Sequence, residues 1–251
     1  MRTLLRLALT LLPALAATPA VAQSCSDPDV ARCKLWKIVS DQCVPEEKAN
    51  QTLKQPCVKV DLAGRYVIIK DNKGPTQYLA IPSEMISGIE DPKILASGAP
   101  NYFADAWQSH DLVSKTLPRE DIGLTINSKA GRTQDQLHIH IDCLLPDVIT
   151  AVRQNAASVT DKWAPFPVNL AGKAYLARTV ASADLSDANP FDLLAKGVPV
   201  AQSDMIKWTL AAVPTTVAGA PGFLLLANHV AGASSEELQG DHEECGKASS
   251  N

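Results

Sequence analysis

Several features that identify common protein classes are scarce or absent in this sequence of 251 residues. Aromatic residues make up only 5%, and 23 basic against 27 acidic side chains give a net charge of −4, so no basic field indicates nucleic-acid binding. No C-x-x-C pair is present, which argues against a thiolate metal site or a thioredoxin-type redox pair. Histidine is rare, with five residues. The remaining composition, 46% apolar and 20% charged, is that of a globular protein.

The first 22 residues have the layout of a secretory signal. Arg2 and Arg6 give a positive start, residues 4–17 are almost wholly apolar, and Ala20-Val21-Ala22 is a typical cleavage site. We therefore expect export with cleavage after Ala22, and the alternative is retention of this segment as an uncleaved anchor. Cleavage removes two basic residues and no acidic one, so it changes the net charge from −4 to −6.

Export makes the six cysteines candidates for disulfide bonds, because exported proteins fold in an oxidising compartment. The pairing cannot be deduced from sequence alone. Proximity in the sequence favours the pairs Cys25–Cys33 and Cys43–Cys57, and elimination leaves Cys143–Cys245 as the third pair. Free or metal-binding thiols are the rival interpretation.

Apolar periodicity predicts an α+β protein without internal repeats. Helical spacing is found in segments 29–43, 102–117, 146–159 and 190–196. Strands are predicted for segments 66–69, 76–81, 122–127, 136–143 and 174–180. A late hairpin is predicted from segments 206–213 and 223–228 with a loop over 214–222, and 45–56 is predicted to be a loop. The polar tail after Glu236 is expected to be frayed.

The most informative segment is the predicted strand over residues 136–143, with the sequence QLHIHIDC. Side chains alternate between the two faces of a strand, so Gln136, His138, His140 and Asp142 are expected on one face and the apolar residues on the other. Three interpretations compete: histidines on a half-exposed strand, a metal site that would need a third ligand, and nucleophilic catalysis by one imidazole. His110, His229 and His242 have no assigned role, and a structural or exposed position is expected for each.

The residues before this strand favour the third interpretation. Asn127, the loop Gly131-Arg132-Thr133 and the strand around His138 resemble the histidine-triad superfamily of nucleotide hydrolases and transferases. The resemblance implies that His138 is the nucleophile, that His140 is the last triad position and that Thr133 is the loop hydroxyl. Gln136 stands at the first triad position, where the superfamily has a histidine. A glutamine can donate a hydrogen bond there but cannot carry the proton. Asp71 matches a ribose-binding aspartate, although the turn-forming sequence Asp-Asn-Lys-Gly explains it equally well.

A narrower resemblance covers roughly residues 33–245. The chain is similar to the bacterial CDP-diacylglycerol pyrophosphatases in its N-terminal segment and in a series of motifs: GRYVIIKD at 64–71, PNYF at 100–103, AWQ at 106–108, INS at 126–128, GRTQ at 131–134, HIHI at 138–141 and YLAR at 175–178. This resemblance implies an antiparallel, histidine-triad-like sheet with flanking helices. It divides the chain into a signal or anchor (1–22), a cysteine-containing helix and loop (23–60), the catalytic core (61–160) and a C-terminal α+β part of the same unit (161–251).

The resemblance also implies a reaction, in which CDP-diacylglycerol is split to CMP and phosphatidate through a covalent adduct on His138. His140, Gln136 and Thr133 are the expected further catalytic residues. Asp71, Asn127, Arg132 and Arg178 are the expected substrate-binding residues. No metal or other cofactor is expected, and the expected partners are the lipid substrate and a membrane surface, with no nucleic acid. The expected location is the periplasm, at or anchored to the inner membrane.

Other classes of function stay open at this point. A metal-dependent phosphohydrolase using His138 and His140 is the first alternative, and a nucleotidyltransferase of the same superfamily is the second. A non-catalytic module that binds a nucleotide or lipid is the third. Phe103 and Trp107, at helical spacing, could face acyl chains, but burial in the core is the more common role of such residues.

Overall fold

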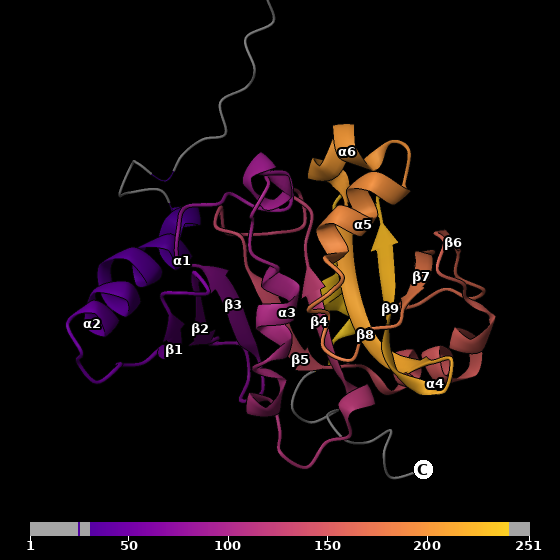
Figure 1. Ribbon diagram of the computed structural model, residues 1–251, viewed down its shortest axis with the longest axis horizontal. Coiled ribbons are helices and arrows are strands. Elements are labelled where there is room, and N and C mark those ends of the chain that lie inside the picture. The colour runs from indigo at the N-terminus through magenta and orange to yellow at the C-terminus, as the bar shows by residue number, and fades with distance from the viewer. Residues whose placement is uncertain (1–24, 26–30, 241–251) are drawn as a thin grey trace, which may run out of the picture.

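A computed structural model of the protein describes Cys25 and residues 31–240. Its centre is a single antiparallel sheet with the strand order β1-β2-β3-β5-β4-β8-β9-β7-β6 (Figure 1). The strands are β1 (Cys57–Asp61), β2 (Tyr66–Lys70), β3 (Tyr78–Pro82), β4 (Ile122–Ile126), β5 (Ile139–Cys143), β6 (Ala164–Pro165), β7 (Leu176–Val180), β8 (Thr209–Val217) and β9 (Ala220–Asn228). The predicted α+β class is therefore confirmed, and one sheet runs from the N-terminal strands to the C-terminal hairpin.

Short helices cover both faces of this sheet. The α-helices are α1 (Lys34–Lys37), α2 (Val44–Lys48), α3 (Tyr102–Trp107), α4 (Pro146–Asn155), α5 (Pro190–Gly197) and α6 (Ala201–Asp204). A π-helical stretch, Ile38–Cys43, joins α1 to α2, and we call residues 31–48 the N-terminal helical segment. Helices α1 and α2 lie beside β1–β3 in Figure 1, and α3 and α5 lie over the middle of the sheet. Within the described residues no helix is both long and apolar enough to cross a bilayer.

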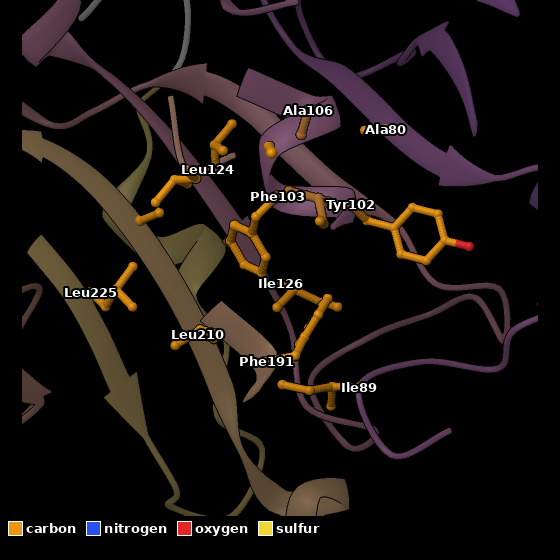
Figure 2. Packing of buried hydrophobic residues seen from close by; sticks show 14 of the residues in the cluster. Ala80, Ile89, Tyr102, Phe103, Ala106, Leu124, Ile126, Phe191, Leu210 and Leu225 are labelled. Carbon is orange, nitrogen blue, oxygen red and sulfur yellow. The ribbon is translucent and has the colours of Figure 1, made fainter. Parts of the chain in front are cut away.

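One face of the sheet forms the main core with α3, α5 and α6. Leu124 and Ile126 of β4 point to this face, as do Ile139 and Ile141 of β5. Figure 2 shows Phe103 of α3 close to the same core, where its ring meets that of Phe191 edge-on at a centroid distance of 5.1 Å. Phe103 and Trp107 are both buried here, so they belong to the core and do not face acyl chains.

The opposite face is covered by two separate groups of side chains. Near β2 and β3, Val39 and Cys43 of the N-terminal helical segment pack on Val67 and Leu79. Near β8 and β9, the helix α4 packs on a second apolar cluster. Between these two clusters lie β5 and β4, whose residues on this face are polar. His140 pairs with Leu79 on one side and with Thr125 on the other, and these partners share its face.

Two of the predicted disulfides are present. Cys25 is bonded to Cys33 and Cys43 to Cys57, which fastens the N-terminal helical segment to itself and to the start of β1. Cys143 is also disulfide-bonded. Its expected partner, Cys245, lies outside the described residues, as do His242 and the predicted signal or anchor (1–22).

Several predicted elements have different bounds in the structure. The segment 45–56 is not all loop, because α2 continues the N-terminal helical segment to Lys48. The helix predicted over 102–117 ends at Trp107, where the Nδ1 atom of His110 lies 2.7 Å from the Trp107 carbonyl oxygen and a 3-10 turn follows. The strand predicted over 136–143 begins only at Ile139.

The late hairpin is longer than predicted, because β8 continues through Pro214 to Val217. A proline cannot donate to a sheet ladder. The residues of β8 that pair with β4 are Leu210 to Ala212 only, so Pro214 lies beyond that ladder, and it pairs with Phe223 of β9. The start of the tail is also ordered, because Ser235–Leu238 forms a 3-10 helix and Leu238 is buried.

Candidate active site

A pocket of about 420 Å³ opens on the polar strip between the two clusters of the second face. Its walls come from the N-terminal helical segment, the ends of β2 and β4, the loop 127–138, β5 and the C-terminal 3-10 helix. The lining residues include both histidines of the HIHI motif and the side chains Lys34, Leu35, Ile38, Ile69, Asp71, Lys73, Leu79, Asn127, Thr133 and Glu236. The lining of the pocket is therefore partly apolar and partly polar and charged.

His138 lies immediately before β5 and is held in one tautomer. Its Nδ1 atom is 2.6 Å from the backbone carbonyl oxygen of Gln136. A carbonyl oxygen only accepts, so Nδ1 carries the proton and donates it. The other ring nitrogen, Nε2, then has the free lone pair. A neutral imidazole with a fixed lone pair on a pocket wall has the form that a nucleophile needs.

His140 lies next to His138, with a ring centroid distance of 5.0 Å and an interplanar angle of 66°. Burial lowers the pKa of both imidazoles, because the desolvated pocket disfavours an imidazolium. The proximity of His138 lowers the pKa of His140 further. At neutral pH both rings are therefore uncharged.

Glu236 is a site residue that the sequence did not reveal. Its Oε2 atom lies 3.6 Å from Nε2 of His140 and accepts a hydrogen bond of 3.1 Å from the side-chain amide of Asn127. Its other carboxylate oxygen pairs with Lys73. Burial acts to raise the pKa of Glu236, but His140, Lys73 and Asn127 outweigh it, so the pKa lies below its usual range. The pocket thus contains an ionised carboxylate beside the second imidazole.

Asn127 was expected to bind substrate, and the structure gives it a different set of partners. Its side-chain oxygen accepts hydrogen bonds from the Ser234 hydroxyl at 2.9 Å and from the Glu236 backbone at 3.3 Å. Its amide donates to the Glu236 carboxylate. Asn127 therefore fixes the C-terminal segment against the end of β4, and it lines the pocket at the same time.

The loop between Asn127 and His138 is held rigidly. Ser128 donates through both its backbone and its hydroxyl to the carbonyl oxygen of Ala233. A side chain at Gly131 would come within 2.3 Å of that same oxygen, so only glycine allows this close approach. The loop therefore presents Thr133, which is exposed, at the rim of the pocket.

Arg132 does not turn a free cation to the pocket, contrary to the expectation for a diphosphate ligand. Its guanidinium makes a bidentate pair with Glu90 at 2.8 and 2.6 Å and also contacts Asp135 at 3.3 Å. Asp135 in turn pairs with Arg32 at 2.7 Å. The buried charge of Arg132 is used to fasten the loop to the N-terminal segment and to Glu90.

Gln136 is not brought together with the histidines on one strand face. Its side-chain amide donates to the carbonyl oxygens of Pro82 and Glu84, and its side-chain oxygen accepts from the backbone of Ile86. The side chain is fully buried by these contacts, because β5 starts only at Ile139 and the predicted alternation does not extend back to this residue. The contribution of Gln136 to the pocket is its backbone carbonyl, which holds His138.

Arg178 lies far from the pocket. It is on β7, which β4, β8 and β9 separate from β5 in the sheet. Four strand spacings correspond to about 19 Å. Its guanidinium lies over the ring of Trp163, 6.0 Å from the centroid. The structure therefore gives no support for Arg178 as a ligand of a substrate bound at His138.

Asp71 lines the pocket and comes directly after β2. Its carboxylate accepts from the backbone of Asn72 at 2.7 Å, as in a turn, and it still lines the pocket. Lys70 is turned to backbone carbonyls of the same turn, including those of Asp71 and Gly74. In this one conformation Asp71 can therefore both stabilise the turn and contact a ligand in the pocket.

The remaining histidines of the described chain have structural surroundings. His110 stacks on Trp107 at a centroid distance of 4.1 Å, and His229 lies against Trp208 at 4.7 Å. No group of three or more histidine, cysteine, aspartate or glutamate side chains that could hold a metal ion is found among the described residues.

Comparison with known proteins relates this arrangement to one family. A family model described as CDP-diacylglycerol pyrophosphatase matches residues 30–248. A CDP-diacylglycerol pyrophosphatase from Yersinia pestis is 43% identical over 217 residues, which cover 83% of this chain and 82% of the relative. The family match therefore includes both the segment with the two pocket histidines and the segment with Glu236.

Proposed function

Because this chain belongs to the CDP-diacylglycerol pyrophosphatase family, we propose that it hydrolyses CDP-diacylglycerol to CMP and phosphatidate through a covalent adduct on His138. The observation that carries the choice of nucleophile is the hydrogen bond from Nδ1 of His138 to the Gln136 carbonyl. It leaves Nε2 as the one nitrogen of this ring that can attack phosphorus.

The reaction has two displacements. In the first, Nε2 of His138 forms a bond to the phosphorus of the cytidylyl group, and the bond from that phosphorus to the bridging oxygen breaks, so that phosphatidate leaves. In the second, water attacks the same phosphorus, its proton passes to a base, and the N–P bond breaks to release CMP. Each step moves one electron pair onto the leaving group and needs no oxidant or reductant.

The surrounding side chains fit supporting roles in these steps. His140 and Glu236 lie next to the nucleophile and can hold or move a proton, because the imidazole is neutral and the carboxylate is ionised. Lys73 and the hydroxyl of Thr133 line the pocket where they can donate to phosphoryl oxygens. Asp71, which also lines the pocket, can accept hydrogen bonds from ribose hydroxyls. We assign Gln136, Asn127 and Arg132 to positioning.

The fold supports a relation to the histidine-triad superfamily as part of this proposal. The antiparallel order β2-β3-β5-β4 places the HIHI motif on a central strand, and the loop with Gly131 and Thr133 comes directly before it. We also propose that the protein is exported to the periplasm and acts at the inner membrane. The disulfides Cys25–Cys33 and Cys43–Cys57 support an oxidising compartment.

Isotope labelling identifies the bond that breaks. Hydrolysis of CDP-diacylglycerol in water enriched in oxygen-18 should place the label in CMP, because water attacks the cytidylyl phosphorus. Mass spectrometry of both products reads the result. Label in phosphatidate instead would mean attack at the lipid phosphorus and would overturn the proposed steps. Absence of both products would overturn the proposed function itself.

A further inference from the structure

We propose that an edge of the molecule next to the pocket, formed by Val200, Ile206 and Val230, docks onto the surface of a phospholipid bilayer. These three residues, which we call the docking edge, have exposed fractions of 55%, 37% and 52%. The inference rests on the proposed function, since it concerns how a lipid substrate reaches the pocket. Exposed aliphatic side chains lose contact with water when they enter a bilayer interface, which favours binding.

Backbone contacts fasten the docking edge to the loop that precedes His138. The amide of Lys129 donates to the carbonyl oxygen of Ile206 at 3.1 Å. On the other side, Ala233 donates to Val230 at 2.9 Å and accepts from Ser128 at 3.2 Å. Ile206 is thus hydrogen-bonded directly to the loop. Val230 is hydrogen-bonded to Ala233, which in turn is hydrogen-bonded to the loop.

Two further hollows lie between the docking edge and the pocket, and neighbouring hollows share lining residues. A groove of about 330 Å³ next to Ile206 is lined by apolar side chains, among them Leu95 and Met205, and also by polar and acidic ones. It shares Glu90 with a second, polar hollow of about 350 Å³, which in turn shares Arg132 with the reactive pocket. The wall of the pocket at Arg132 and the docking edge at Ile206 are therefore separated by two hollows only.

The charges near these hollows suit an anionic lipid surface. Lys129 and Lys34 are exposed, on the loop and at the pocket wall respectively. The acidic residues that line the groove next to Ile206 have partners within the protein, because Glu90 pairs with Arg132 and the Asp91 carboxylate accepts from backbone amides. The chain as a whole carries a net charge of −4, so attraction to anionic phospholipid has to be local.

The N-terminal segment joins the fold on the same side. Cys25 is bonded to Cys33, and the neighbouring Arg32 pairs with Asp135 of the loop at 2.7 Å. Seven residues of sequence lie between the apolar stretch 4–17 and Cys25. The chain from the end of this stretch to Cys25 can span at most roughly 29 Å. If the apolar stretch stays in a bilayer, this tether keeps the loop and the docking edge close to the membrane surface.

The test compares one enzyme on two forms of its substrate. The triple variant Val200→Ser, Ile206→Ser, Val230→Ser is assayed on long-chain CDP-diacylglycerol in phosphatidylglycerol-containing vesicles and on a short-chain CDP-diacylglycerol dispersed as monomers. The control variant is Leu62→Ser, Val168→Ser, which removes two aliphatic residues of 41% exposure elsewhere on the surface. Leu62 follows β1 at the end of the hairpin opposite to Asp71.

We expect the triple variant to lose at least about tenfold in kcat/KM on vesicles and to keep its kcat/KM on monomers, because only the bilayer contact is removed. The control variant should keep both. Equal kcat/KM on vesicles for the triple variant and the wild type, an equal loss on both substrates, or the same vesicle-specific loss in the control would each overturn the docking edge. Failure of the wild type on monomers as well as on vesicles would instead overturn the proposed function.

Discussion

The two halves of the sheet use the same face in different ways. On β5 and β4 this face carries His140, Asp142 and Thr125, which are polar and buried, and His140 lines the pocket. On β8 and β9 it carries apolar residues such as Leu224 and Leu226, which α4 covers. One half thus carries the polar groups of the pocket, where we propose that the reaction takes place, and the other half supplies burial. Changes in the first should alter turnover, and changes in the second should alter stability.

The largest expected effect is on turnover in the first half. The variant His138→Ala should lose about 10⁴-fold or more in kcat, because it removes the nucleophile. CMP release from CDP-diacylglycerol measures it. His229→Ala, which removes an exposed imidazole from outside the pocket, should keep its activity. Near-normal turnover by His138→Ala would contradict the assignment of the nucleophile.

The matching change in the second half is Leu224→Ala. Leu224 is fully buried in the cluster under α4, so the free energy of unfolding should fall by about 2–5 kcal/mol, while kcat/KM of the folded protein stays near that of the wild type. Denaturant unfolding and steady-state kinetics on the same preparation check both values. A loss of kcat/KM larger than the loss of folded protein would show that the two halves are coupled more closely than their packing suggests.

A smaller effect is expected where the two halves meet at Glu236. The variant Glu236→Gln keeps the hydrogen bonds of the side chain in part but removes the charge next to His140 and Lys73. We expect kcat to fall by about 10–100-fold with a smaller change in KM, as for loss of an acid–base partner. Arg178→Ala is the control, because this charged residue lies on β7, four strands away from β5 in the sheet. Equal effects of the two variants would contradict the role given to Glu236.

The smallest effect concerns pH. Burial lowers the pKa of His138 and His140, so the folded protein binds fewer protons than the unfolded chain at a pH below the ordinary histidine value of 6.5. The contribution of the two neutral histidines to the free energy of unfolding is therefore fully present above pH 6.5, and it is lost as the pH falls below 6.5. The free energy of unfolding should therefore decline on acidification from pH 6.5, and the acid limb of kcat/KM should lie below 6.5. An acid limb at or above 6.5 would contradict a neutral, buried nucleophile.

Local sequence patterns predicted much of the first half of the molecule. Alternation placed His140 and Asp142 on the face opposite Ile139 and Ile141, because β5 is a regular strand between two partners. The same alternation failed at Gln136, since that residue lies outside the strand. Local pattern also identified the two short-range disulfides, whose cysteines are close in the sequence.

Partners that are distant in the sequence could not be predicted. Nothing in the residues around Glu236 reveals that this segment folds back to Asn127 and His140. In the same way, Arg132 looks like a free cation until the fold brings Glu90 to it. Both residues are charged, and tertiary structure supplies the partner of each. The function of a charged residue therefore depends on contacts that periodicity does not encode.

The most direct test of the account is to trap the covalent adduct. CDP-diacylglycerol labelled in the phosphate next to cytidine is mixed with the enzyme, quenched with alkali within one turnover, and the protein is digested for mass spectrometry. An N–P bond survives alkali, so we predict a cytidylyl group on the peptide that contains His138, attached to that residue and absent in His138→Ala. Full turnover with no label on the protein, or the label on His140 instead, would contradict His138 as the nucleophile.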